Sequence, residues 1–155
     1  MGLWDKIKSN VGIGQPKVEL VLDTNMIAMG GQVTCTINIT GGTRELPMKE
    51  VGITINQIQK YKDGDGKPKT DTNRVLKHAL PLDGQLLEVE GSASFELPIN
   101  IPEKILPSEK NLKYEIRGWL DIPGMDASQK HDLTILYANK NLDNIKDKLD
   151  DMMNS

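Results

Sequence analysis

The sequence contains a single cysteine, Cys35, among 155 residues. An internal disulfide is therefore excluded, which fits a reducing compartment such as the cytosol. Aromatic residues are scarce, with two Trp, three Tyr and one Phe, so the core must be mainly aliphatic. No stretch approaches the roughly 18 consecutive apolar residues of a transmembrane helix. Neither a disulfide-stapled scaffold nor a membrane-spanning helix is expected.

The N-terminus and the charge balance argue against further classes. Residues 1–10 contain no apolar h-region, so a secretory signal is not expected. Gly2 suggests myristoylation, but Lys6 stands where that motif requires Ser or Thr. The net charge is −3 and no basic stripe is visible, which argues against nucleic-acid binding. These features predict a cytoplasmic protein without a nucleic-acid partner.

Alternation of apolar and polar residues with period two dominates the middle of the chain, as in half-buried β-strands. In the clearest example Val33, Cys35 and Ile37 share one face, opposite Thr34 and Thr36. We expect seven strands, near residues 17–22, 33–39, 51–58, 74–80, 87–97, 112–122 and 133–137. Because no helical pattern separates them, they predict one all-β domain, a two-sheet sandwich of immunoglobulin type.

Local signals mark where these strands bend and end. A change of apolar parity around Gln57 predicts a β-bulge. The polar segment 62–73, which contains glycine and proline, predicts an exposed hairpin loop. Pro98, Pro102 and Pro107 are expected to exclude regular pairing in the connection that follows residue 97.

Only the two ends show helical spacing of apolar residues. We therefore divide the chain into an N-terminal amphipathic segment (1–15), a sandwich (16–138) and an amphipathic C-terminal helix (139–155). These apolar stripes supply the candidate partner-binding residues, which are Leu3, Trp4, Ile7, Leu142, Ile145, Leu149 and Met152. Apolar stripes should not remain in water, so they are covered by the sandwich itself, by a second copy or partner, or by a membrane.

Residues able to do chemistry are few. Asp63-Gly64-Asp65-Gly66 opens like a calcium loop, but Lys67 and Pro68 then occupy positions that need a ligand oxygen and glycine. Cys35 shares the apolar face of its strand and is expected to be a buried, inert thiol. One cluster near a strand junction is a candidate metal or catalytic set: Asp121, Asp126, His131 and Asp132. We expect no cofactor and no enzymatic activity.

Several short motifs share their order and spacing with one bacterial family. In chain order they are Val11-Gly12-Ile13-Gly14, Lys17-Val18, Val33, Ile37, Ile39-Thr40-Gly41-Gly42, Phe95-Glu96-Leu97-Pro98-Ile99, Ile101-Pro102, Pro107-Ser108, Tyr114 and Leu120-Asp121-Ile122. From residue 3 to residue 137 the chain resembles the sporulation-control protein M family. It departs from familiar members at Cys35, where they carry glycine, and beyond residue 138, where they continue into a second sandwich.

The resemblance implies an arrestin-like β-sandwich of seven to eight strands, with a short N-terminal helix and an amphipathic C-terminal helix. It also implies a non-enzymatic scaffold linked to control of sporulation and to cell-division or envelope events. Our interpretation is a cytoplasmic module that binds a protein partner through strand edges, loops or its terminal segments.

Two alternatives come from other classes of protein. A peripheral membrane protein would insert Leu3, Trp4 and Ile7 into the lipid interface. A small metal-dependent hydrolase would use the set Asp121, Asp126, His131 and Asp132. A homo-oligomer formed through the C-terminal helix is a further hypothesis for the partner.

Overall fold

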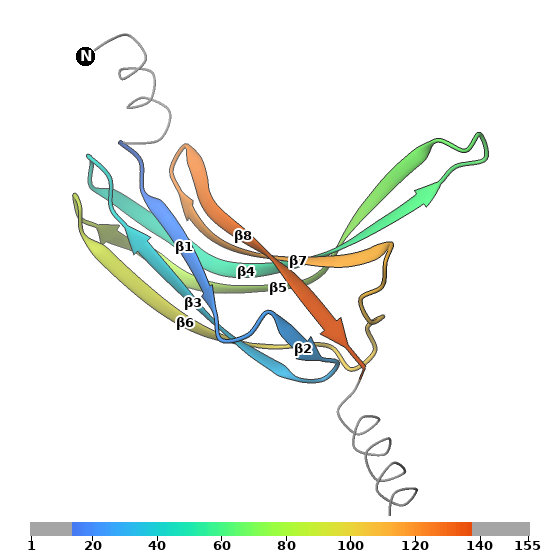
Figure 1. Ribbon diagram of the computed structural model, residues 1–155. Helices are drawn as coiled ribbons and strands as arrows, with labels where there is room; N and C mark the ends of the chain where they lie inside the picture. Colours follow the sequence, from blue (N-terminus) through green and yellow to red (C-terminus); the bar gives the residue numbers. More distant parts are fainter. Residues whose placement is uncertain (1–13, 138–155) are drawn as a thin grey trace, which may run out of the picture.

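The computed structural model describes residues 14–137, and eight β-strands account for most of this range (Figure 1). Their bounds are Lys17–Leu22 (β1), Met26–Ala28 (β2), Gln32–Thr40 (β3), Leu46–Lys62 (β4), Pro68–Leu87 (β5), Ser92–Asn100 (β6), Leu112–Ile122 (β7) and Met125–Leu136 (β8). The predicted all-β class is confirmed. The two predicted terminal helices lie outside the described residues.

The strands form two sheets that face each other (Figure 1). The smaller sheet has the order β1-β3-β6, and the larger has the order β2-β8-β7-β4-β5. All pairings are antiparallel except the short parallel pairing of β2 with β8. Since β1, β5 and β6 each end a sheet, three long strands leave one edge unpaired by any described strand.

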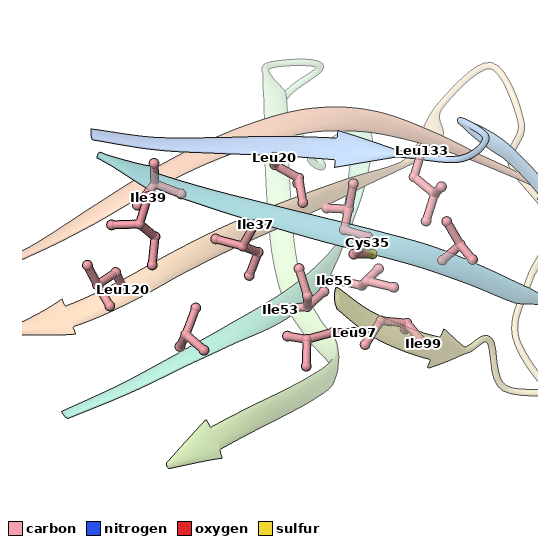
Figure 2. Close-up of a cluster of buried hydrophobic side chains, with 14 of the residues drawn as sticks. Leu20, Cys35, Ile37, Ile39, Ile53, Ile55, Leu97, Ile99, Leu120 and Leu133 are labelled. Carbon is pink, nitrogen blue, oxygen red and sulfur yellow. The ribbon is translucent and has the colours of Figure 1, made fainter. Parts of the chain in front are cut away.

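Side chains of alternate residues fill the space between the sheets (Figure 2). The strict alternation in β3 buries every second residue, as the sequence predicted for this strand. Burial of this aliphatic set supplies the main stabilisation, at about 25 cal/mol per Å² of apolar surface. The core residues labelled in Figure 2 are Leu20, Cys35, Ile37, Ile39, Ile53, Ile55, Leu97, Ile99, Leu120 and Leu133.

Tyr114 is the one large aromatic side chain in this core, and its hydroxyl is fully bonded. The hydroxyl donates to the Leu106 carbonyl at 2.6 Å and accepts from the Gln57 side-chain amide at 3.0 Å. These two bonds offset the cost of burying a polar atom. They also tie the connection after β6 to the larger sheet.

The predicted bulge is confirmed, but its extra residue lies on the opposite strand. The pairing of β4 with β5 shifts between Ile55, which faces Leu76, and Asn56, which faces Arg74. Val75 of β5 is therefore the unpaired residue, whereas β4 keeps a continuous register with β7. The apolar residues of β4 change from one face of the strand to the other here. The strand leaves the sandwich at this point, so neither of its faces borders the core.

The hairpin of β4 and β5 extends far beyond the sandwich as a two-stranded arm (Figure 1). The sequence predicted a loop over 62–73, but pairing continues to Lys62 opposite Pro68, and only residues 63–67 form the turn. Most side chains of the arm are exposed, so neither face buries enough apolar surface to produce an alternating pattern. Backbone pairing, rather than side-chain burial, defines the strands there.

Two further expectations are corrected, and one strand was not expected. The expected strand 87–97 is divided, because β5 ends at Leu87 and β6 begins at Ser92 after a turn containing Glu90 with φ of 54°. Pro98 lies within β6 opposite Thr34, which an edge strand tolerates where the missing N–H would face solvent. The three-residue strand β2 was too short to show a pattern.

Cys35 is fully buried, as predicted from its position on the apolar face of β3. Burial, and to a smaller extent the negative charge of Asp23, raises the pKa of its thiol to about 12. The thiolate is the nucleophilic form of cysteine, so this thiol is unreactive in the folded protein near neutral pH.

We expect Cys35 to react with a thiol reagent only after unfolding. Labelling of the native chain and of chain in denaturant, followed by mass spectrometry, checks this, and rapid native labelling would contradict it. Cys35→Ser should lower the free energy of unfolding by about 1–3 kcal/mol, because a hydroxyl would be buried without a partner. Cys35→Ala is the control that adds no hydroxyl.

Candidate functional site

The candidate partner-binding residues of the two termini lie outside the described residues. This group comprises Leu3, Trp4, Ile7, Leu142, Ile145, Leu149 and Met152. Their proposed contacts with a partner or a membrane stay predictions. Within residues 14–137, no helix has the length and apolar character needed to cross a membrane.

The acidic candidate set does not converge on one point. Asp121 of β7 and Asp126 of β8 are cross-strand neighbours, whereas Asp132 lies six positions further along β8, opposite Glu115. His131 points to the other face of the sheet, where its Nε2 lies 2.7 Å from the Leu20 carbonyl oxygen. In the described part of the chain no three His, Cys, Asp or Glu residues are placed to hold a metal ion. The hydrolase alternative therefore loses the residue cluster on which it was based.

The segment that resembled a calcium loop is a hydrogen-bonded turn. Asp63 Oδ1 accepts from the backbone N–H groups of Asp65 and Lys67, both at 2.9 Å. The Asp63 carboxylate also lies 4.0 Å from the Lys69 ammonium. Asp63 therefore stabilises the tip of the hairpin arm, as an Asx turn does.

A groove of about 720 Å³ runs between β1 and the middle of β8. It lies between two strand edges, because β1 ends the smaller sheet and β2 covers β8 only at residues 134–136. The groove is lined by Glu19, Leu20, Val21, Leu22, Asp23, Thr24, Asn25, Gln129, His131 and Asp132. Three of these are acidic and none is Lys or Arg, so the groove favours a partner of positive charge. Sequence reasoning did not find it, since it depends on where two distant strands end up.

Side chains of β8 bond the edge of β1 at the centre of this groove. The Leu20 N–H donates to Gln129 Oε1 at 2.7 Å, and the Leu20 carbonyl accepts from His131 Nε2. These bonds satisfy backbone groups that a neighbouring strand would otherwise bond on this side of β1, and they link the two sheets. The Leu20 backbone is therefore already satisfied.

The edge of β8 stays open beyond the reach of β2. The Thr134 N–H donates to the Asn25 carbonyl at 2.8 Å, so the N–H groups of even-numbered residues in β8 point toward this edge. Within the described residues, the backbone groups of Lys130 and Asp132 face no neighbouring strand on that side. An unpaired row of this kind is the usual template for addition of an extended peptide.

A second hollow, of about 470 Å³, lies on the face of the larger sheet that points away from the smaller one. Trp119 of β7 is its only aromatic residue, and charged side chains of both signs surround it. The Trp119 indole N–H donates to Thr54 Oγ1 at 3.0 Å, and the Lys77 ammonium lies 5.5 Å from the ring centroid. Neither Trp119 nor this outer face was singled out by the sequence pattern.

The architecture defines a class: an all-β protein of two facing sheets, with open grooves at a strand edge and on a sheet face. The chain belongs to the Spo0M family, whose model, described as SpoOM protein, matches residues 4–151. The family predicted from the short motifs is thereby confirmed.

A solved structure agrees with this fold. The chain is similar to the crystal structure of Spo0M, a sporulation control protein from Bacillus subtilis, with a TM-score of 0.71 and 16% sequence identity. The alignment covers 90% of this chain and 56% of that chain, so this sequence spans little more than half of its structural relative. No curated protein matches the chain.

Proposed function

We propose that this chain is a non-catalytic, arrestin-like interaction module that acts in control of sporulation, or of related cell-division or envelope events. It binds an extended segment of a protein partner, which adds as a strand to the open edge of β8. Membership of the Spo0M family and the likeness to a sporulation control protein support the biological setting.

The observation that carries this proposal is the unpaired edge of β8 beside an acidic groove. Main-chain hydrogen bonds to an edge strand supply affinity, and side-chain pockets next to it supply selectivity. Glu19, Asp23 and Asp132 are among the residues that line the groove, so we expect the bound segment to carry Lys or Arg.

Asp132→Pro should weaken partner binding strongly without unfolding the module. Proline removes the outward N–H of residue 132, and its ring obstructs an incoming strand, while an edge strand tolerates it. The partner is first identified by cross-linking and affinity purification from the source organism, and its binding to each purified variant is then measured by calorimetry. We expect at least about a tenfold loss of affinity, since several main-chain bonds depend on this edge.

Asp132→Ala is the matched control, because it removes the carboxylate and keeps the backbone donor. It should weaken a basic partner only slightly, in the range of an exposed ion pair. A folded Asp132→Pro variant, verified by thermal melting, that binds with unchanged affinity would show that the partner does not use this edge.

A further inference from the structure

The outer face of the larger sheet carries its charges in separate rows. Strand registers place these rows two residues apart along the strands, on the side opposite the core residues Val51, Ile53 and Leu120. The acidic row consists of Glu50, Asp121 and Asp126, and the basic row consists of Lys77, Arg117 and Lys130. Between them lies an uncharged row made of Ala79, Gly52, Trp119 and Ser128.

Trp119 dominates the uncharged row because its neighbour has no side chain. A Cβ at Gly52 would overlap the six-membered ring of Trp119, so the indole lies across the backbone of β4. The bond to Thr54 Oγ1 fixes its orientation. Trp119 is half-buried and held in this way, so it offers a rigid apolar surface. Tryptophan is among the residue types that contribute most to the binding energy of protein interfaces.

The charges on either side are only partly compensated by their neighbours. Asp121 lies 3.9 Å from the Lys49 ammonium, and Glu115 lies 3.5 Å from Arg117 and 3.6 Å from Lys130. Among the described residues, Glu50, Asp126 and Lys77 form no ion pair, and the buried Nε of Arg117 has no hydrogen-bond partner. The face therefore keeps unmatched charge of both signs.

The acidic row also shows the effect of mutual repulsion. Partial desolvation, followed by the carboxylates of Asp121 and Glu50, raises the pKa of Asp126. A cation placed opposite this row would favour the ionised carboxylates.

We propose that two copies of this chain pair face to face through this surface, about a two-fold axis that runs along the uncharged row. Rotation about that axis keeps the order of the strands and exchanges the two charged rows. Asp126 then faces Lys130 of the second copy, Asp121 faces Arg117 of the second copy, and the two Trp119 side chains meet at the centre. A face that is complementary to itself under a two-fold rotation is what an isologous dimer requires.

A charge-reversal experiment tests this arrangement with the full 155-residue chain. In the dimer, Asp126→Lys alone and Lys130→Glu alone each place like charges opposite one another at two symmetric positions. Sedimentation velocity over a concentration series should show a dimer for the wild-type chain, and about a tenfold or larger rise in dissociation constant for each variant. An equimolar mixture of the two variants should restore dimers, because both contacts become attractive again.

Three comparisons complete the design. Trp119→Ala should also dissociate the dimer. Lys17→Glu changes the charge by the same amount as Lys130→Glu, but on β1 of the other sheet, and it should have no effect. Higher ionic strength should weaken association, because the Debye length falls to about 3 Å at 1 M. Thermal melting verifies that each variant is folded.

A monomeric wild-type chain at every concentration would overturn the proposal. A dimer that is unaffected by both reversals would also overturn it, because another surface would then be the interface. Failure of the mixture to recover dimers, with both variants folded, would also overturn it, because Asp126 would then not face Lys130 of the second copy. The outcome at Asp132→Pro is independent, since that variant tests the edge of β8 and not this face.

Discussion

Ile37→Ala is expected to lower the free energy of unfolding by about 2–5 kcal/mol. Ile37 is fully buried at the centre of β3, where it packs between the two sheets (Figure 2). Truncation removes its burial energy and leaves a cavity, because strands on both sides are held in register by their ladders and cannot close the gap. Urea unfolding followed by intrinsic fluorescence measures the change as a shift of midpoint at constant slope.

Thr36→Ala is the matched control for this substitution. Thr36 is the preceding residue of the same strand, but its side chain lies on the outer face and is only half-buried. Its loss should cost less than about 1 kcal/mol, the range of strand propensity. If the two substitutions destabilise equally, the space between the sheets is not the main source of stability.

Gly118 explains why this part of the core is sensitive. A Cβ at Gly118 would lie 3.2 Å from Leu20 Cδ1 and 3.4 Å from Ile37 Cγ1, so glycine on β7 makes room for branched side chains of the opposite sheet. The core thus matches a large residue on one sheet with an absent side chain on the other. The sequence showed Gly118 in the apolar parity of its strand, but only the pairing of the sheets shows which residues use the space.

Strands with one buried face were predictable from the sequence. In β3 and β7 every second residue enters the core, so the period-two pattern follows directly from the physics of burial. The arm of β4 and β5 was not predictable in this way, because its residues are exposed on both sides. Its strands depend on backbone pairing, which leaves no periodic trace in the side chains.

The alternation of side chains along a strand also explains why the acidic candidate set does not converge. His131 and Asp132 are adjacent on a strand, so their side chains must point to opposite faces. Strand parity therefore separates the two residues as soon as this segment is assigned to a strand. The expected last strand began only at Leu133, which hid the contradiction.

The groove and the charged face were beyond sequence reasoning for a different reason. Asp121 and Asp126 are close in sequence, but Glu50 and Lys77 join the same surface only through the registers of β4 with β7 and β5. Such registers are set by the turn and by the fit of the whole core. Trp119 becomes conspicuous only when Gly52 is seen beneath it.

Gly41→Ala is expected to destabilise the protein by about 3 kcal/mol, the upper end of the usual cost of overpacking. Gly41 and Gly42 directly follow β3, and both are buried where three backbone segments meet. The Gly41 N–H donates to the Gly91 carbonyl at 2.7 Å, and a Cβ at Gly41 would overlap the carbonyl oxygen of Glu88. Backbone atoms of the turn between β5 and β6 would have to move to make room. A flexible side chain in the same place could rotate away at lower cost.

Gly64→Ala provides the matched control, since a Cβ at Gly64 in the hairpin turn meets nothing within 4 Å. Its effect should stay within about 0.5 kcal/mol, as for an ordinary surface substitution. Thermal and urea unfolding of the two variants compare the same chemical change at a crowded and an open position. Equal stability of the two would mean that the turn after β5 moves freely, and that the close approach of β3 to this turn contributes little to the fold.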